Sequence, residues 1–585
     1  MPSYQPPLND QRFLLFEVLR AGEVLGALPA FAEADAPLLA QVLEEAGKFV
    51  GEVIAPLQAV GDAPGCRFEQ GRVVTPPGFA DAYRAFWQAG WPSLACAPED
   101  AGQGLPWVLE GVLYEMLSGA NHGWTMAPGL LHGAYECIKH HGSDELKATY
   151  LPRLASGEWL ATMCLTEPQA GSDLGLCRTQ GVPQPDGSFR LAGSKIFISG
   201  GEHDLTDNIV HLVLAREPGA PAGPKGLSLF LAPKILPPPL GEGRDGGGDG
   251  ARNGVVCDRI EEKMGLHGSP TCVLRFDEAI AWRVGEAGRG LNAMFVMMNA
   301  ARLHVALQGI GLLDAAWQKA DAYAHERTQM RAPGVLRGAG AADPIIRHPA
   351  VRRILDTERA WIDGLRLLAY RTGLELDLAR HHPDAARRAA AQQWCSLVTP
   401  VLKAVCTEQG FSGASRCLQV FGGHGYVREW GIEQIVRDSR VTMIYEGTNE
   451  IQAIDLLVRK VLPDGGAALV ALLDALASGL GNTAADLEVL ARFMQLRALT
   501  SDLSKAAAAD PALPYEAADD YLRAVGLALF GWAWRCIETH PGAQAPRWAL
   551  PAAAARLRVL PEFEMRLSIL RRQCDAADIG QPTEA

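Results

Sequence analysis

A β-prone stretch of the sequence lies between two longer helical stretches, and this order restricts the fold more than any other feature. Before residue 160, apolar side chains such as Leu39, Leu43 and Val50 recur at three- and four-residue spacing, which is the period of an amphipathic helix. From about 161 to 290 the sequence changes to short β-prone runs separated by Gly and Pro, as in a compact all-β unit. After this stretch the helical pattern returns.

Within this order, individual elements can be predicted. The predicted strands are 189–198, 209–215, 227–231 and 271–276, and the predicted long helices are 291–330, 348–380 and 385–422. Two stretches rich in Gly and Pro, 237–254 and 331–343, show no periodicity and are predicted to be surface loops.

The length of the chain requires more than one hydrophobic core. A single core stops growing at roughly 250–300 residues, whereas this chain has 585 residues and 48% hydrophobic composition. We therefore predict a multidomain fold with four segments. They are an α-helical N-terminal domain (1–160), a central β-barrel or sandwich domain (161–290), an α-helical bundle domain (291–460) and an extra helical C-terminal extension (461–585). We expect this extension to pack on the rest of its own chain.

The charge of the protein argues against a generic binder of polyanions. The formal net charge is −13, and the extension 461–585 contains 11 basic and 15 acidic residues. The extension is therefore not a basic arm for nucleic acid. A local Arg or a helix N-terminus can still bind a phosphate group on an acidic protein.

The 12 cysteines are scattered, and no two form a C-x-x-C pair, so structural zinc and thioredoxin-like redox chemistry have no support. Reduced thiols in a chain of this length indicate a cytoplasmic location. The first residues lack a basic segment followed by an apolar one, and no run of about 18 uncharged apolar residues is present. The sequence therefore predicts no metal site, no export signal and no membrane span.

Three separated segments contain the small and polar residues from which a catalytic site could be built. The first is 163–173 (MCLTEPQAGSD), where the helices give way to strands. Small residues and hydroxyls there allow a planar, polar ring to approach the backbone. The second is 421–426 (FGGHGY), preceded by Gln419, and the third is 444–452 (IYEGTNEIQ).

Each segment taken alone also has a purely structural interpretation. The string 166–168 (TEP) is compatible with a turn, and the glycine-rich 422–425 with the end of a helix. The glycine-rich string is not a dinucleotide fingerprint, since it follows a helix and lacks the G-x-G-x-x-G spacing. Glu446 with Thr448 is more typical of a helix cap, and His424 alone of a structural loop histidine.

Together and in this order, the three segments resemble the acyl-CoA dehydrogenase family. The resemblance extends from about 40 to 460 and includes 195–199 (KIFIS), 265–269 (GLHGS), 299–302 (NAAR) and 326–327 (ER). The opening segment 4–10 (YQPPLND) and the extension look like the subgroup of 3-methylmercaptopropionyl-CoA dehydrogenases.

The resemblance implies FAD as the cofactor and Glu446 as the catalytic base, on the loop beside the flavin. Some relatives carry the base instead on the helix that contains 299–302. The matching position in this chain is Ala301, which cannot accept a proton. Of the two positions that carry the base in the family, the resemblance therefore implies Glu446.

The resemblance also implies cofactor and substrate contacts. The implied FAD-binding residues are Leu165, Thr166, Gly171, Ser172, Phe197, Ser199, Arg327, Gln419, Gly423 and Thr448. Leu165, Thr166, Phe197 and Ser199 match contacts of the isoalloxazine ring. Arg327, Gln419 and Gly423 match positions that hold the pyrophosphate and adenine half of an FAD from a neighbouring subunit. The implied substrate-binding residues are Ser172, Asn299, Arg302, Tyr445 and Gly447.

Two positions depart from the family pattern. Phe197 replaces the more usual Trp, and Met330 stands where a Phe usually follows the Gln of the Arg-x-Gln string. The detailed contacts of the family are not carried over at these two positions.

The implied reaction is the α,β-dehydrogenation of an acyl-CoA thioester to the trans-2-enoyl-CoA. The implied substrate is 3-(methylthio)propanoyl-CoA or a fatty acyl-CoA, as in β-oxidation. The Cα–H bond is a very weak acid, so donors must polarise the thioester carbonyl while a carboxylate removes the proton. In the family the backbone N–H of the base residue and a flavin hydroxyl polarise the carbonyl, and the flavin accepts the hydride. Electrons are expected to pass to electron-transfer flavoprotein.

Two other functions remain open at this point. An acyl-CoA oxidase has the same fold and uses oxygen as its acceptor. A non-metabolic flavoprotein could instead bind nucleic acid through the extension, although the acidic charge of the extension and the intact Glu446 favour the dehydrogenase.

The resemblance also implies an assembly of subunits, because FAD lies at a subunit interface in the family. An extension of this size can cover a helical face that would otherwise recruit a second dimer. We therefore expect a homodimer.

Overall fold

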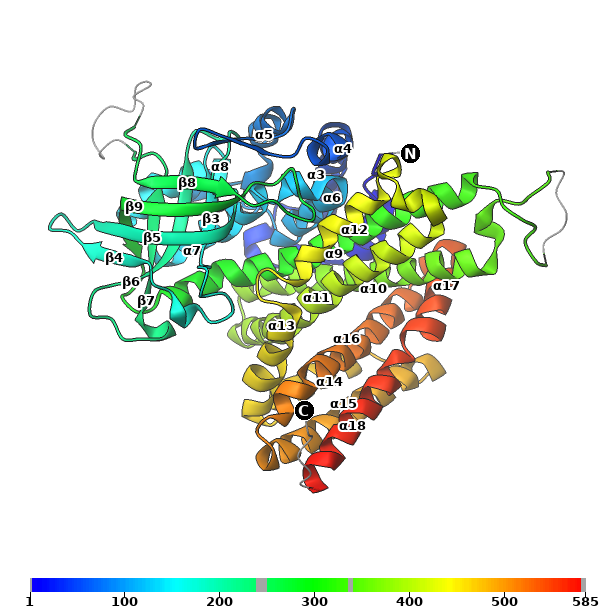
Figure 1. The fold of residues 1–585 in the computed structure, drawn as a ribbon. Coiled ribbons are helices and arrows are strands. Elements are labelled where there is room, and N and C mark those ends of the chain that lie inside the picture. Colours follow the sequence, from blue (N-terminus) through cyan, green and yellow to red (C-terminus); the bar gives the residue numbers. More distant parts are fainter. Residues whose placement is uncertain (1–2, 238–249, 335–339, 580–585) are drawn as a thin grey trace. The chain divides into compact units, whose positions relative to one another are not determined.

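The computed structural model describes residues 3–237, 250–334 and 340–579, and the chain forms two compact units (Figure 1). The mixed unit comprises Lys48–Glu110 and Ala120–His304. The helical unit comprises Met1–Gly47, Gly111–Gly119 and Val305–Ala585. The architecture is therefore a helical N-terminal part, a β part and a helical C-terminal part with extra helices, as predicted. The finer division into four domains stays a prediction.

A seven-stranded sheet forms the β part of the mixed unit. Its strands are β3 (Leu160–Cys164), β4 (Gln180–Pro183), β5 (Phe189–Ser199), β6 (Ile209–Arg216), β7 (Leu227–Pro233), β8 (Val255–Ile260) and β9 (Thr271–Val284). The strand order is β3-β6-β4-β5-β9-β7, with β8 on β9. Because β7 also pairs with β6, the path closes on itself around an apolar interior that includes Leu191, Val213, Phe230 and Leu274. A closed path leaves few exposed strand edges.

Four of these strands were predicted, and three were missed. The missed strands β3, β4 and β8 are four to six residues long, and β4 contains Gly181 and Pro183, two residue types that are depleted in strands. A small hairpin, β1 (Arg67–Glu69) and β2 (Arg72–Val74), was also missed within the helical N-terminal part. The part of the predicted loop 237–254 that spans 238–249 lies outside the described residues.

Helices complete the mixed unit. They are α4 (Gln58–Asp62), α5 (Phe79–Gln88), α7 (Leu131–His141), α8 (Asp144–Ser156) and the parts of α3 (Ala36–Phe49), α6 (Trp107–Thr125) and α9 (Gly290–Glu326) that fall within it. Helix α6 has a kink at Asn121, whose φ of −159° is not helical. The Asn121 Oδ1 atom accepts a hydrogen bond of 3.1 Å from the Trp124 backbone N–H, which restarts the helix after the kink.

The helical unit is built around long helices that the sequence pattern predicted closely. They are the C-terminal part of α9, α10 (Pro349–His381) and α11 (Ala385–Val420), joined by the shorter α1 (Leu8–Arg12), α2 (Ala21–Gly26), α12 (Ile432–Arg440) and α13 (Asn449–Leu456). The predicted helices ended within a few residues of these bounds. Of the predicted loop 331–343, residues 335–339 lie outside the described part of the chain.

The extension, as far as the structure describes it (to residue 579), adds five α-helices to the same unit. They are α14 (Ala467–Ala477), α15 (Ala484–Ala509), α16 (Leu513–Thr539), α17 (Pro546–Ala554) and α18 (Glu562–Ile579). Helix α16 packs against α10, α11 and α13. A Cβ atom at Gly364 would come within 2.4 Å of the Phe530 ring, and the Trp534 indole N–H donates to the Ala360 carbonyl at 3.1 Å. The extension therefore packs on its own chain, as predicted.

Buried ion pairs and hydrogen bonds connect these helices. Arg366 is completely buried, and its guanidinium lies 2.6 Å from the Glu115 carboxylate and 3.5 Å from that of Asp314. The Tyr370 hydroxyl donates to the second Glu115 oxygen at 2.6 Å. At the other end of the network, the Arg547 guanidinium of the extension donates to both carboxylate oxygens of Asp363, at 2.8 and 2.9 Å. A buried network of paired charges of this kind favours one arrangement of its helices.

Among the described residues, α9 is long and apolar enough by composition to cross a membrane, but 72% of its most apolar window is buried inside the protein. That burial is expected for a helix in a protein core.

Candidate functional site

In the mixed unit, Leu165 and Thr166, which were predicted to contact the flavin ring, lie on a loop that follows β3. After Cys164, the Leu165 carbonyl accepts a hydrogen bond of 2.9 Å from the Lys195 ammonium, and the Thr166 carbonyl accepts one of 2.9 Å from the Ile196 N–H. Lys195 is completely buried and forms an ion pair of 2.8 Å with the buried Glu167. These contacts bring Leu165 and Thr166 beside the strand that carries Phe197 and Ser199.

The Glu167 carboxylate is the centre of this arrangement. It accepts hydrogen bonds from the Thr179 N–H at 3.0 Å, the Thr179 hydroxyl at 2.6 Å and the Arg178 N–H at 2.8 Å. Burial raises the pKa of Glu167, but Lys195 and these donors more than offset it and lower the pKa to about 2. Glu167 belongs to the 163–173 motif, but the sequence does not predict its structural role.

Replacement of Glu167 by Gln is expected to destabilise the mixed unit and to change its acid response. The folded-state pKa is lowered, so the ion pair stabilises the fold above pH 4.5 and loses its effect as the pH falls from 4.5 to about 2. We expect Glu167→Gln to lose about 3–5 kcal/mol at neutral pH, and the difference from wild type to shrink within that window. Urea unfolding at several pH values measures both effects. Glu326→Gln, at an exposed carboxylate, is the control, and a difference that does not vary with pH would contradict the assignment.

Phe197 presents its ring to solvent on a distorted part of β5. The register between β5 and β9 shifts between Lys195 and Ile198, and Phe197 has a φ of +61° with 61% of its surface exposed. Left-handed backbone at an aromatic residue costs on the order of 1–3 kcal/mol and occurs mainly at functional sites. The exposed ring suits contact with another flat ring.

The other predicted residues of the mixed unit lie on its surface or on α9. Gly171 and Ser172 are exposed on the loop before Asp173, whose carboxylate accepts a hydrogen bond from the Gly175 N–H. Asn299 is exposed, whereas Arg302 is buried and lies 3.4 Å from the Asn299 side-chain oxygen. Ala301 lies beside them, with 7% of its surface exposed.

In the helical unit, one cavity of about 600 Å³ brings together the residues predicted for the adenine half of FAD. Arg327 directly follows α9, and its N–H donates to the Tyr323 carbonyl at 2.8 Å. Gln419 lies in the last turn of α11, and Gly423 in the following 3-10 helix Gly422–Tyr426. All three line the cavity. Arg327 and Gln419 are exposed, so their donors are accessible to a bound anion or base.

Aromatic side chains fix the glycine-rich wall of this cavity. The Tyr323 hydroxyl lies 2.9 Å from His424 Nδ1, and the His424 ring stacks on Trp430 with 4.7 Å between ring centroids. The Tyr323 ring stacks in turn on Phe421 at 4.3 Å. His424 is therefore a structural residue here, consistent with its simpler interpretation. Tyr323 and Trp430 were not predicted, since neither belongs to the three segments.

Met330 also lines the cavity. It has a φ of +56° and is 77% exposed. Like Phe197, it departs both from the family pattern and from ordinary backbone conformation.

Glu446 lies on a short loop between the 3-10 helix Val441–Met443 and α13. Its φ is +58°, and that of Gly447 is +86°. The Thr448 hydroxyl caps α13 by accepting a hydrogen bond of 3.3 Å from the Ile451 N–H. The helix cap and the predicted base therefore occur together in one loop.

Side chains outside the predicted set hold this loop. The buried Gln452 side chain donates to the Glu446 carbonyl at 3.0 Å, and the buried Lys403 ammonium donates to the Gly447 carbonyl at 2.8 Å. The Tyr445 hydroxyl donates to the Gln308 side chain at 2.5 Å. Burial, and then the nearby Glu446, raise the pKa of Tyr445 well above its ordinary value, which keeps the hydroxyl protonated as a donor.

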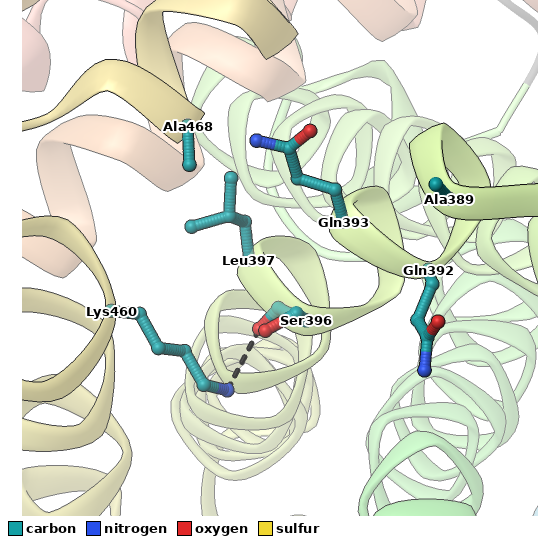
Figure 2. Close-up of a pocket in the computed structure, with 7 residues that line it drawn as sticks. All are labelled: Ala389, Gln392, Gln393, Ser396, Leu397, Lys460 and Ala468. Atoms are coloured by element: carbon teal, nitrogen blue, oxygen red, sulfur yellow. Dashed lines mark hydrogen bonds between the residues drawn. The ribbon is translucent and has the colours of Figure 1, made fainter. Parts of the chain in front are cut away.

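A second cavity of about 330 Å³ in the helical unit is lined by none of the predicted site residues (Figure 2). Its walls come from α11, Lys460 and Ala468. The Lys460 ammonium donates to the Ser396 carbonyl at 2.8 Å, the contact drawn as a dashed line. Among residues 3–237, 250–334 and 340–579, no cluster of three or more His, Cys, Asp or Glu side chains is arranged to hold a metal ion.

Comparisons with known families match most of the chain. The N-terminal domain of acyl-CoA dehydrogenases matches residues 39–158, the middle domain 162–279 and the C-terminal domain 288–461. The chain thus has the fold and the sequence of a flavin-dependent dehydrogenase, and it belongs to the acyl-CoA dehydrogenase family. It is accordingly an oxidoreductase, and FAD is its cofactor.

Characterised relatives share much of the length of the chain. A 3-methylmercaptopropionyl-CoA dehydrogenase from Ruegeria pomeroyi is 43% identical over 538 residues, which cover 91% of this chain and 90% of the relative. A broad-specificity linear acyl-CoA dehydrogenase from Mycobacterium tuberculosis is 36% identical over 80% of this chain and 77% of the relative. Because 91% of this chain is matched, the similarity to the first relative includes at least part of the extension.

Solved structures support the fold. The Caenorhabditis elegans protein ACDH-11, solved with C11-CoA, has a TM-score of 0.78 and 21% identity, covering 100% of this chain and 96% of that one. An acyl-CoA dehydrogenase from Bacillus anthracis, solved with FAD, has a TM-score of 0.71 and 20% identity, covering 96% and 91%.

Proposed function

We propose that this enzyme oxidises an acyl-CoA thioester to the trans-2-enoyl-CoA, with 3-(methylthio)propanoyl-CoA or a short linear acyl-CoA as substrate and electron-transfer flavoprotein as acceptor. The substrate assignment is supported by the 43% identity to a 3-methylmercaptopropionyl-CoA dehydrogenase over nearly the whole chain. A relative of broad specificity for linear acyl-CoA supports a linear chain as the second substrate, and a butyryl-CoA dehydrogenase that is 35% identical over 71% of this chain supports a short one.

The observation that carries the proposal is the conformation of Glu446. Glu446 is on left-handed backbone, and buried donors hold its own carbonyl and that of Gly447, so the backbone that carries the carboxylate is fixed. A fixed backbone at the base suits removal of a proton from a weak carbon acid, because general-base catalysis depends on geometry. Ala301, at the alternative base position, has no titratable group.

The residues of the chain fit FAD. Arg327 offers a planar fork of donors in a cavity of sufficient size, which is suited to a pyrophosphate. Phe197 offers an exposed ring, and Leu165 and Thr166 lie on a loop fixed beside it. When bound, FAD supplies the acceptor for the hydride. Glu446 accepts the α-proton, and its backbone N–H donates to the thioester carbonyl.

Replacement of Arg327 by Ala is expected to weaken FAD binding rather than the chemical step. Loss of a charge-assisted hydrogen bond should raise the dissociation constant for FAD about 10- to 100-fold. The ratio of flavin to protein after purification, and flavin retention during dialysis, measure the effect. Arg352→Ala, on α10 and outside the cavity, is the matched control. If Arg327→Ala retains its flavin as tightly as wild type, the role of Arg327 is wrong.

A panel of acyl-CoA substrates tests the function. Chain lengths from propanoyl to palmitoyl, together with 3-(methylthio)propanoyl-CoA, are assayed with an artificial electron acceptor. We expect the highest kcat/KM for the thioether substrate or for a short linear chain. Turnover in air with stoichiometric peroxide, and none with electron-transfer flavoprotein, would instead identify an oxidase.

We further propose a homodimer, because Arg327, Gln419 and Gly423 match family positions that hold the FAD of a neighbouring subunit. The extension covers faces of α10, α11 and α13, which removes a surface for further association. Light scattering of the flavin-loaded protein should give twice the chain mass of 62.7 kDa. A tetramer would refute the blocking role of the extension, and an active monomer would refute the shared site.

The remaining assignments concern location and nucleic acid. A cytoplasmic location is supported by twelve cysteines that are all free thiols. Nucleic-acid binding has no support from the acidic extension, and a filter-binding assay at low salt tests it.

A further inference from the structure

We propose that Lys403 is a positioning residue for the base: its ammonium holds the Gly447 carbonyl, and this contact keeps Glu446 and its backbone N–H in the orientation that the reaction needs. The inference rests on the proposed dehydrogenation. It concerns a residue on α11, 44 positions before the carbonyl that it binds.

Lys403 is buried completely within α11. Its ammonium donates to the Gly447 carbonyl at 2.8 Å and to the Asn449 side-chain oxygen at 3.1 Å. Asn449 is held further by the Thr407 hydroxyl at 3.2 Å, and it donates to the Ala404 carbonyl at 3.2 Å. One face of α11 therefore binds both the loop and the first residue of α13.

The loop needs such anchors because its backbone is strained. Glu446 has left-handed φ, which costs on the order of 1–3 kcal/mol and persists only where the surroundings enforce it. Gln452 binds the Glu446 carbonyl from α13, and Lys403 binds the next carbonyl from α11. A Cβ atom at Gly447 would lie only 2.8 Å from the Gln452 side-chain nitrogen. Two consecutive carbonyls are thus fixed by side chains from two helices.

A lysine is an unfavourable choice here for packing alone. Burial penalises its charged form, and a cation beside a helix N-terminus opposes the helix dipole. An apolar side chain would fill the space without either cost. What lysine adds is a charge-assisted hydrogen bond to a backbone carbonyl, which is shorter and stronger than a neutral one. Tight positioning matters because a shift of about 1 Å can reduce the rate about 100-fold.

The test compares Lys403→Met with Lys460→Met in the flavin-loaded enzyme. Both lysines donate to a backbone carbonyl at 2.8 Å in the same unit, but Lys460 binds the Ser396 carbonyl in α11 (Figure 2) and not a carbonyl of the base loop. We expect Lys403→Met to reduce kcat about 30- to 100-fold, while KM and flavin content stay within about threefold. Lys460→Met should leave kcat within about threefold of wild type. Lys403→Arg, which keeps the charged donor, should recover part of kcat.

A second readout is independent of turnover. Amide hydrogen exchange of the peptide that covers 445–449 should be faster in Lys403→Met and unchanged in Lys460→Met. Unchanged exchange in Lys403→Met would overturn the inference, and so would faster exchange with wild-type kcat. If Lys403→Met does not fold, the shorter and neutral Lys403→Gln should give the same changes in kcat and exchange, and wild-type values in it would overturn the inference. A wild-type enzyme that no acyl-CoA reduces would instead refute the proposed function. The exchange data would still show whether Lys403 holds the Gly447 carbonyl.

Discussion

Replacement of Glu446 by Gln is expected to abolish turnover in a folded enzyme that retains FAD. The amide has nearly the same shape as the carboxylate but cannot accept the α-proton, and loss of a general base typically costs about 10²–10⁴-fold. We expect the upper end of that range, because Ala301 offers no substitute base. Anaerobic reduction of the flavin by acyl-CoA, followed as loss of its visible absorbance, measures the step directly.

The control for this variant is Glu450→Gln. Glu450 is exposed, lies in the first turn of α13 only four positions from the base, and carries the same group. Its replacement should leave flavin reduction within about threefold of wild type. Flavin reduction above about 1% of the wild-type rate in Glu446→Gln would contradict the assignment of the base.

Replacement of Arg366 by Met is expected to cause a large loss of stability in the helical unit. The buried guanidinium neutralises Glu115 and lies close to Asp314, and both carboxylates are also completely buried. Its removal leaves the Glu115 charge uncompensated, whereas Asp314 keeps its ion pair with Arg359 at 3.0 Å. An uncompensated buried charge typically costs about 3–5 kcal/mol. Urea unfolding of the flavin-loaded protein, followed by circular dichroism, should show the transition at lower denaturant.

Arg497→Met provides the comparison for a surface ion pair. Arg497 pairs with Asp474, and both side chains are partly exposed, so the expected loss is below about 1 kcal/mol. Similar losses in the two variants would show that the buried network does not stabilise the unit in the way described.

The long helices could be predicted closely because α9, α10 and α11 each exceed thirty residues, a length that excludes a strand. Short strands could not, since four to six residues without alternation give no clear period. The order of the strands and the closure of the sheet depend on pairing between distant segments, which no local pattern contains.

The candidate site likewise contains residues that could be predicted from the sequence and residues that could not. Residues in contiguous motifs, such as Thr166, Gly423 and Glu446, could be named from the sequence. Lys403 could not, because a lysine is normally expected at the surface and nothing local marks it as buried. The left-handed backbone of Phe197 and Glu446 could not be predicted either, because tertiary contacts impose this conformation on residues that do not favour it.

The interleaving of the two units has a consequence for synthesis. Residues 111–119 belong to the helical unit although they are flanked on both sides by the mixed unit. Within them, Glu115 is bonded to Arg366, 251 positions later. At translation rates of about 5–20 residues per second, Arg366 emerges from the ribosome about 13–50 s after Glu115. Until then the Glu115 carboxylate has to stay hydrated, so α6 cannot reach its final packing before Arg366 has left the ribosome.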